Sequence, residues 1–315
     1  MKKNRAHRFK VFALAFGVSL VVLSIIFIPI MLRISPLRDY SDYFGNSSGK
    51  GSGEVKSVYT PASADSLTLL AIVTDGGKAR YFLLLRLDAL NKRILVSSLP
   101  YNMRVITTER TDTLAGYDAY GGTLQVKNIL ELLFKVTIDR TARMTSTNFI
   151  KSINTLGTVK YNLPYSLIHK DTSSNNYINI PKGAQTLDGR TIYDMFRFPS
   201  YREGEEHRYK VQSDVLTKLL NQSLTPWLNE HGESVFNTLV NLTETDLSYA
   251  DYQQRRALLR SLIEETEEPA LPIFVSGQFT DSFSITQKSV DTIAMYFKSD
   301  PPEQEEGSRD ETSGE

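Results

Sequence analysis

An uncharged apolar run near the N-terminus constrains this chain more than any other feature of its sequence. Residues 11–32 carry no charged side chain. As a helix rising about 1.5 Å per residue they would be roughly 33 Å long. That length matches the hydrocarbon core of a bilayer, which is about 30 Å thick. The sequence therefore predicts a single membrane-spanning helix at residues 11–32.

A cleaved signal peptide is the alternative interpretation of this run. Its apolar region usually has about 7–15 residues, with small residues at a cleavage site behind it. Here the run is longer and Arg33-Ile34-Ser35-Pro36 follows it, so an uncleaved anchor is favoured. Basic residues are denser in residues 1–10 than just after the run. The positive-inside rule then places residues 1–10 in the cytoplasm and the C-terminal bulk outside the cell membrane.

Composition divides the rest of the chain into four parts. Residues 33–65 contain a Gly/Ser-rich stretch that cannot bury a core, so a flexible extracytoplasmic spacer is expected. A globular domain is expected at residues 66–247, with a C-terminal extension at 248–298. Residues 299–315 are acidic and are predicted to be disordered. The absence of cysteine excludes disulfides and thiolate metal sites.

Apolar segments after residue 66 have both strand and helix spacing. Strands are predicted at residues 67–73, 81–87, 93–99, 159–163 and 177–180, and helices at 121–134, 148–156, 186–196, 210–228 and 251–264. Residues 272–278 and 290–297 are expected to add strands, and Pro226 is expected to end or kink its helix. This mixture predicts an α/β (α+β) sandwich, with a central mixed β-sheet flanked by helices.

Standard catalytic motifs are missing from the sequence. It contains no P-loop, no Gly-x-Gly-x-x-Gly, no Gly-x-Ser-x-Gly and no His-Glu-x-x-His. The four histidines are too scattered to predict a metal site. No element of a nucleic-acid-binding type is present, so a nucleic-acid partner is not expected. Asp75-Gly76-Gly77 follows a predicted strand and suits either a plain turn or a loop that approaches a ligand.

Two arginines stand on either side of a glycine-containing loop. One predicted helix ends near Arg197, and the next begins near Arg208, with Gly204 between them. Guanidinium groups bind phosphate oxygens through forked, charge-assisted hydrogen bonds, so this pair could clamp a phosphate. A solvated charged loop is the simpler interpretation, and composition alone favours it.

Several short segments occur in an order that carries a family resemblance. In chain order they are Ile94-Leu95-Val96-Ser97-Ser98-Leu99-Pro100; Ala119-Tyr120-Gly121-Gly122; Asn148-Phe149 with Leu156-Gly157-Thr158-Val159; Ile180-Pro181-Lys182-Gly183 with Gln185, Leu187, Asp188 and Gly189; and Arg197, Gly204, Arg208 and Gln212. Each segment is weak alone. Together, across residues 66–247, they resemble the LytR-CpsA-Psr family of bacterial cell-envelope proteins.

The resemblance implies both a ligand and an activity. Such proteins bind a polyprenyl-phosphate-linked glycan in an apolar pocket and transfer the glycan phosphate to peptidoglycan. Arginines neutralise the pyrophosphate and acidic residues hold a divalent cation, typically Mg²⁺. Carried onto this chain, the resemblance implies Asp75, Arg80, Arg197 and Arg208 as catalytic residues. It also implies lipid-phosphate binding by Lys78 and these arginines, and metal binding by Asp75.

This sequence departs from the family pattern at several of these positions. The family's Arg-Ser-Asp-Thr falls on Lys78-Ala79-Arg80-Tyr81, so Arg80 replaces the metal-binding aspartate. The family's Arg-Asp after the proline is Tyr101-Asn102, and its lysine before Tyr-Gly-Gly falls on Thr113. Its second helix-end arginine falls on Pro199 and its loop aspartate on Glu205. Losing one charge-stabilising group costs about 10²–10³-fold in rate.

Three hypotheses remain open at this point. The first is a membrane protein of cell-envelope assembly that binds the lipid phosphate but has lost its transferase activity. The second is a working phosphotransferase with a rearranged site, in which a guanidinium partly replaces the metal charge. The third is a non-catalytic envelope scaffold that holds a partner through its acidic tail or its apolar pocket.

Overall fold

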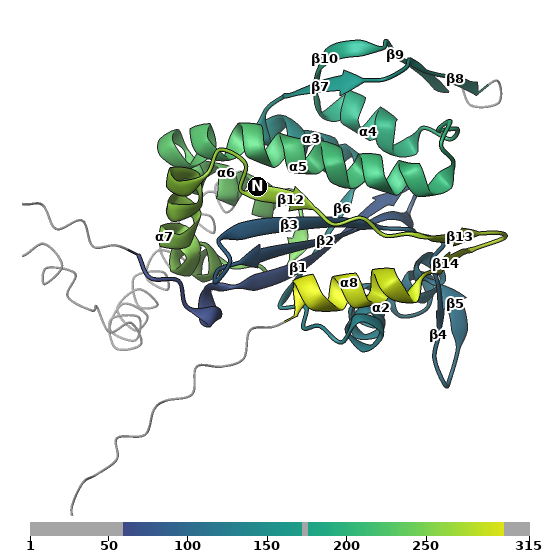
Figure 1. The fold of residues 1–315 in the computed structure, drawn as a ribbon, viewed down its shortest axis with the longest axis horizontal. Helices are drawn as coiled ribbons and strands as arrows, with labels where there is room; N and C mark the ends of the chain where they lie inside the picture. Colours follow the sequence, from purple (N-terminus) through teal and green to yellow (C-terminus); the bar gives the residue numbers. More distant parts are fainter. Residues whose placement is uncertain (1–58, 172–175, 299–315) are drawn as a thin grey trace, which may run out of the picture. The chain divides into compact units, whose positions relative to one another are not determined.

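A six-stranded mixed sheet forms the centre of the computed structural model, which describes residues 59–171 and 176–298 (Figure 1). The strand order is β11-β6-β1-β2-β3-β12. β1 pairs antiparallel with β2, and β2 with β3, whereas β6 and β12 run parallel to β1 and β3. The bounds are β1 (Leu67–Asp75), β2 (Lys78–Asp88), β3 (Arg93–Leu99), β6 (Arg140–Thr145), β11 (Glu244–Thr245) and β12 (Ala270–Pro272). The three predicted strands between residues 67 and 99 are confirmed.

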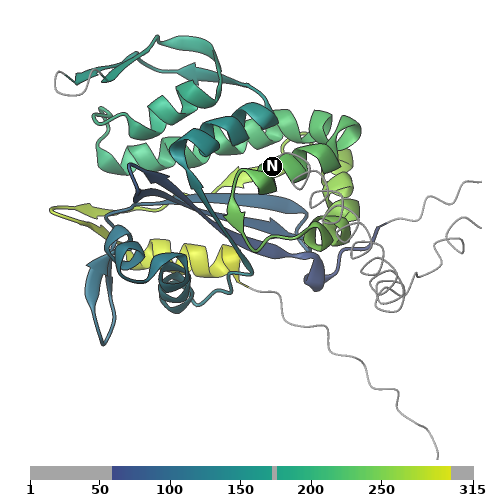
Figure 2. The ribbon, with the colours of Figure 1, turned by 180° about the vertical axis from the view of Figure 1, so that it is seen from behind.

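Helices cover both faces of this sheet (Figures 1 and 2). α2 (Leu114–Phe134) and α8 (Gln287–Phe297) pack against one face. α3 (Ser146–Leu156) and α5 (Glu205–Glu230) cover the other. α4 (Gly189–Arg197), α6 (Gly232–Asn241) and α7 (Tyr249–Glu265) extend this second layer. The predicted class, a central mixed sheet flanked by helices, is confirmed.

Short elements lie at the periphery. The strand pairs are β4 (Arg104–Ile106) with β5 (Thr111–Thr113), β7 (Val159–Leu163) with β10 (Gly183–Leu187), β8 (Leu167–Asp171) with β9 (Asn176–Ile180), and β13 (Gly277–Phe279) with β14 (Phe283–Ile285). A 3-10 turn, η2 (Ser63–Asp65), precedes β1. The predicted strands at residues 159–163 and 177–180 are confirmed as β7 and most of β9.

The central strands are apolar on both sides because both faces of the sheet are covered. Successive side chains of a strand point to opposite faces. Leu70, Ile72 and Leu84 thus face α2 and α8, whereas Ala71 and Leu83 face the α5 layer. This double burial explains why the central strands appear in the sequence as continuous hydrophobic runs.

Some predicted helix boundaries are wrong by several residues. α2 begins at Leu114, where Thr113 accepts a hydrogen bond from the N–H of Gly116 at 3.1 Å. Gly121 and Gly122 have non-helical backbone angles inside it, so the glycine pair marks a break and not the first turn. α4 begins at Gly189 because Asp188 caps it, accepting from the Thr191 N–H at 2.8 Å.

Three expectations for the C-terminal half of the chain are corrected, wholly or in part. Residues 290–297 are helical and not a strand, since Val290, Ile293 and Phe297 lie on one side of α8 and pack into the core. Pro226 lies inside α5, which continues to Glu230, so this proline does not end the helix; that it kinks the helix stays a prediction. The expected strand at residues 272–278 is only partly formed, at the end of β12 and the start of β13. β12 joins the central sheet and α8 buries Ile293 and Phe297, so residues after 266 complete the fold.

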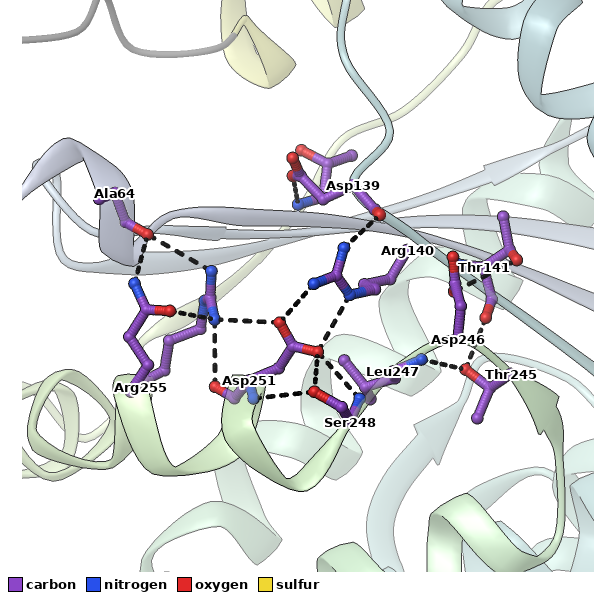
Figure 3. Close-up of polar contacts among 12 residues, drawn as sticks. Ala64, Asp139, Arg140, Thr141, Thr245, Asp246, Leu247, Ser248, Asp251 and Arg255 are labelled. Atoms are coloured by element: carbon purple, nitrogen blue, oxygen red, sulfur yellow. Dashed lines mark hydrogen bonds and ion pairs between the residues drawn. The ribbon is translucent and has the colours of Figure 1, made fainter. Parts of the chain in front are cut away.

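α7 is tied to the edge of the sheet by a polar network (Figure 3). Arg140 on β6 donates two hydrogen bonds to the Asp251 carboxylate, at 2.9 and 3.0 Å. Arg255, one turn along α7, donates to the backbone oxygens of Asp251, Ala64 and Ser66. Ser248 caps the helix and also donates to Asp251 at 2.7 Å. These contacts join α7, β6 and the segment before β1.

The predicted membrane helix at residues 11–32 lies outside the described residues. The same holds for the basic tail at 1–10, for most of the spacer, and for the acidic tail at 299–315. Among the helices within residues 59–298 that the structure describes, none is both long and apolar enough to span a bilayer.

Candidate functional site

An apolar pocket of about 350 Å³ lies between the sheet and the α5 layer. Its floor is formed by alternate side chains of β1, β2 and β6, among them Leu69, Leu83 and Met144. Its walls come from α3, α5, α6 and α7 and include Phe149 and Leu216. Only four of its lining residues are not apolar: Arg86, Ser152, Thr243 and Thr245. This apolar pocket suits a hydrocarbon ligand.

A second cavity of about 240 Å³, here called the basic cavity, lies at the ends of the strands. It is lined by Asp75, Arg80, Tyr81, Tyr101, Phe196, Arg197, Arg208, Tyr209 and Gln212. Four residues that the family resemblance singled out, Asp75, Arg80, Arg197 and Arg208, are thus brought together. Lys78 is exposed and is not among the lining residues.

The sheet topology explains why residues far apart in sequence meet here. β1 ends beside the start of β2, and β3, antiparallel to β2, ends beside the same point, with Phe82 paired to Leu99. α4 ends and α5 begins above this end of the sheet (Figure 1). The cavity is therefore built from two strand ends, the loop after β3 and two helix ends.

A β-bulge directs Arg80 into the basic cavity. Val73 pairs with Tyr81 and Thr74 with Ala79, so Arg80 is an extra residue with no partner on β1. A bulge of this kind interrupts the alternation of side chains and re-aims them. Arg80 and its neighbour Tyr81 consequently both line the basic cavity, where regular alternation would send them to opposite faces.

Arg197 and Arg208 are each held by a carboxylate three residues earlier. The Nε of Arg197 donates to Asp194 at 2.8 Å. The Nη2 of Arg208 donates to Glu205 at 2.9 Å and to the carbonyl of Pro199 at 2.8 Å. Within the described residues, however, Arg197 Nη2 and Arg208 Nε are buried and have no hydrogen-bond partner. Each guanidinium is thus fixed in place with one donor nitrogen unsatisfied.

Arg80 differs from the other two arginines. Its side chain is exposed at the rim, and its guanidinium carbon lies 5.5 Å from the centre of the Tyr101 ring. It forms no hydrogen bond or ion pair with any residue in the described part of the chain. Its charge is therefore not neutralised by a neighbouring carboxylate.

Asp75 is oriented by two neighbouring hydroxyl groups. Ser146 Oγ donates to the carboxylate at 3.3 Å. Burial and a hydrogen bond to Asp75 raise the pKa of Tyr193 to about 12, so this phenol remains a neutral donor near pH 7. Burial also raises the pKa values of Tyr81 and Tyr209 above their usual range. The cavity is lined by three phenols, three guanidinium groups and one carboxylate.

Gln212 joins the elements that hold the arginines. Its amide nitrogen donates to the carbonyl of Phe196 at 3.2 Å, and its oxygen accepts from Ser98 Oγ at 2.5 Å. Ser98 in turn donates its backbone N–H to Ser213 Oγ at 2.9 Å. The end of β3, the end of α4 and the first turns of α5 are thereby linked, which fixes Arg197 relative to Arg208.

Three aromatic rings separate the basic cavity from the apolar pocket. Phe196 lines the basic cavity and lies 5.3 Å from Tyr81 and 5.2 Å from Phe149, measured between ring centroids. Phe149 lines the apolar pocket on the other side. Both cavities therefore lie on the same face of the sheet, one after the other along β1 and β2. A ligand with a charged head and an apolar tail could occupy both if these rings moved aside.

The lining of the basic cavity does not fit a resident Mg²⁺. Magnesium takes oxygen ligands in octahedral geometry and is usually anchored by carboxylates. Asp75 is the only carboxylate among the lining residues, and Arg80 occupies the position where the resemblance places a second. Among the described residues, no group of three or more His, Cys, Asp or Glu side chains could hold a metal. The family's metal site is therefore not reproduced by these side chains.

Sequence reasoning missed several residues around this site. Tyr209 lines the basic cavity, and Tyr193 and Ser146 orient Asp75. A signal for Tyr209 was available, since Arg208-Tyr209 repeats the dipeptide Arg80-Tyr81 and both pairs line the cavity. Ser146 stands in the first turn of α3 and has no such signal.

Solved structures with the same fold cover most of the described chain. A protein from Eubacterium siraeum, described as a transcription regulator, is 17% identical with a TM-score of 0.70, covering 80% of this chain and 98% of its own. TagT bound to LI-WTA is 18% identical with a TM-score of 0.59, covering 78% and 95%. B. subtilis TagV is 16% identical with a TM-score of 0.58, covering 74% and 95%. At sequence identities of 16–18%, the similarity to these structures establishes the fold alone.

Sequence comparisons identify the family. An uncharacterised Staphylococcus aureus protein is 32% identical over 78 residues, which is 25% of this chain and 19% of that relative. This chain thus spans about a fifth of the curated relative's length. The model of the LytR_cpsA_psr family matches residues 71–298, which is more than half of the chain and includes every residue of the basic cavity. The chain belongs to the LytR-CpsA-Psr family.

Proposed function

We propose that this protein binds a polyprenyl-phosphate-linked glycan at the outer face of the cell membrane. The phosphate would lie in the basic cavity and the hydrocarbon in the apolar pocket. The observation that carries the proposal is that Arg197 and Arg208 line one cavity, and that each has a buried guanidinium nitrogen, Nη2 and Nε respectively, without a hydrogen-bond partner among the described residues.

Unsatisfied buried donors favour an anionic ligand. Leaving a buried polar group without a partner costs about 1–3 kcal/mol, and more when the group is charged. A phosphate oxygen accepts charge-assisted hydrogen bonds from guanidinium groups and would remove this cost. Because Arg197 and Arg208 are already held by Asp194 and Glu205, little side-chain freedom would be lost on binding.

The apolar pocket supports a lipid as the rest of the ligand. Each methylene moved from water into such a pocket contributes about 0.8 kcal/mol. The pocket and the basic cavity follow each other along one face of the sheet, which matches a ligand that is apolar at one end and charged at the other. The fold is that of TagT, which was solved bound to LI-WTA.

Phosphoryl transfer by this site is proposed to be slow or absent. Transfer requires stabilisation of the charge that develops on the phosphate. The basic cavity offers one carboxylate, Asp75, and lacks the second acidic position that the family resemblance implies. Binding needs only cationic and apolar groups, which the site retains, so binding would survive where the transfer rate does not.

Polyprenyl phosphate binding by the full-length chain in mild detergent tests the proposal. The double variant Arg197→Ala/Arg208→Ala should weaken binding by about a hundredfold or more, since each charged hydrogen bond contributes roughly 1.5–3 kcal/mol. Arg202→Ala is the matched control, because Arg202 lies in the same α4–α5 loop, stacks on Tyr165 and does not line the cavity. Equal binding by the double variant would contradict the proposal.

A second candidate function is a transferase with a rearranged site. It is favoured by the convergence of Asp75, Arg80, Arg197 and Arg208 on one cavity. Release of polyprenyl phosphate from a lipid-linked glycan, with magnesium present, distinguishes the two functions. We expect binding without release. Release that Arg197→Ala/Arg208→Ala abolishes would establish the transferase instead. Convergence of the arginines also argues for ligand binding over a purely scaffolding role.

A further inference from the structure

We infer that the basic cavity binds its phosphate group without a divalent cation, and that Arg80 supplies the charge that a cation would otherwise bring. The inference rests on the proposed function, because the phosphate is that of the proposed lipid. It assigns to Arg80 a specific task that differs from the tasks of Arg197 and Arg208.

The charge distribution around the basic cavity separates Arg80 from the other cations. Arg197 and Arg208 each form an ion pair with a carboxylate, at 2.8 and 2.9 Å. These pairs fix the two guanidinium groups but offset part of their charge. Arg80 is the lining cation for which the described residues provide no carboxylate partner. A bound dianion would therefore be attracted chiefly by Arg80, with Arg197 and Arg208 supplying oriented hydrogen bonds.

The backbone holds Arg80 where this task requires it. As the extra residue of the β-bulge, it is re-aimed toward the cavity. Its guanidinium lies over the Tyr101 ring at 5.5 Å, an interaction that costs little to replace at an exposed site. Moving onto a phosphate would break no ion pair, because Arg80 has none among the described residues.

The same arrangement disfavours a metal ion. A dication near Asp75 would find one carboxylate ligand and a guanidinium at the rim of the same cavity. Like charges at short range oppose each other, and a single carboxylate offers few of the oxygen ligands that Mg²⁺ requires. A guanidinium can instead donate two parallel hydrogen bonds to phosphate oxygens, which a point charge cannot do.

Isothermal titration of the full-length chain in mild detergent with farnesyl pyrophosphate tests the inference. The titration is run once with magnesium chloride and once with EDTA. We expect the same dissociation constant in both buffers, within about twofold. Arg80→Ala should weaken binding by about tenfold to a hundredfold in both, the range for one charge-assisted contact. Arg202→Ala is again the matched control, an arginine of the α4–α5 loop that stacks on Tyr165 and does not line the cavity, and should change binding by less than about twofold.

Reversing the charge at position 80 tests whether a metal ion can take over the role of Arg80. Arg80→Asp adds a second carboxylate to the cavity that Asp75 lines. This variant should not bind in EDTA, and magnesium should restore part of its binding. Arg80→Asn removes the cation without adding a ligand and should gain nothing from magnesium. Because Arg80 is exposed, all variants should unfold at the wild-type temperature.

The outcomes separate this inference from the proposed function. Wild-type binding that requires magnesium would overturn the inference and leave the proposed function standing. Wild-type affinity in Arg80→Ala would also overturn it. No binding by the wild-type chain in either buffer would overturn the proposed function and the inference together.

Discussion

The two faces of the central sheet are formed by the same strands but are filled differently. The largest fully buried side chains of the described residues, all except Phe196, belong to the face covered by α2 and α8. The face under α5 contains the apolar pocket and the basic cavity instead. Close packing on one face can stabilise the fold while the other face leaves space for a ligand.

Polar contacts attach a wall of the hollow face to the sheet. α7 contributes Leu259 to the wall of the apolar pocket, and the Arg140–Asp251–Arg255 network joins it to the sheet edge. Leu258 and Leu262 of α7 are also fully buried, so polar and apolar contacts together hold this wall in place. One face of the sheet is therefore filled by a close-packed core, whereas the other face contains the two cavities.

The largest expected effect comes from truncating neighbouring leucines of β2. Leu84→Ala, on the filled face, should lower the free energy of unfolding by about 3–4 kcal/mol, because it leaves a cavity in a close-packed core. Leu83→Ala should cost roughly 1–2 kcal/mol, since Leu83 already borders the apolar pocket and has fewer contacts to lose. Urea unfolding of both variants measures the difference. Equal losses would show that the two faces are equally packed.

The next largest effect is the loss of stability at low pH when Asp251, which attaches α7 to the sheet, becomes protonated. Although burial acts to raise it, hydrogen bonds from Arg140 and Ser248 lower the pKa of Asp251 from 3.8 to about 2. A depressed pKa stabilises the fold above the unfolded value and loses that contribution as pH falls through the folded value. Asp251 should thus contribute about 2 kcal/mol above pH 4, lost progressively toward pH 2.

Unfolding measured across this pH range tests the contribution. The stability gap between the wild type and Asp251→Asn should shrink as pH falls from about 4 to about 2. Asp246→Asn is the control, because this neighbouring carboxylate accepts hydrogen bonds from Thr141 but from no arginine. A gap that stays constant over the whole range would contradict the assignment.

The smallest expected effect comes from adding a phenyl ring to either face of β1. Ala71→Phe places a ring in the apolar pocket and should weaken binding of a polyprenyl phosphate by about tenfold, or roughly 1.4 kcal/mol, with stability nearly unchanged. Its neighbour Ile72 is fully buried on the filled face, so Ile72→Phe should destabilise the protein by about 1–3 kcal/mol through overpacking. Binding of inorganic pyrophosphate should be unaffected by Ala71→Phe. A loss of stability in Ala71→Phe, or a loss of binding without a loss of stability in Ile72→Phe, would contradict the assignment of the two faces.

Errors in the predicted fold have identifiable causes. The sequence does not predict β6, because its residues, Arg-Thr-Ala-Arg-Met-Thr, lack a hydrophobic run. Its two arginines are accommodated by Asp251 and by Asp118, which lie 111 and 25 residues away. The sequence predicts a strand at residues 290–297 because short apolar runs fit both the strand period and the helix period. Only the packing of Ile293 and Phe297 beside α2 distinguishes the helix.

The sequence was enough to predict β1, β2 and β3 of the central sheet, most of the helices, and the cationic residues that the family resemblance singles out. It could not determine that Arg80 belongs to the basic cavity and Lys78 does not. That distinction depends on a bulge opposite Val73 and Thr74, which arises only when β1 and β2 pair. Nor could it place Arg197 and Arg208 beside Asp75, because strand ends and helix ends meet only after the sheet and the α5 layer pack together.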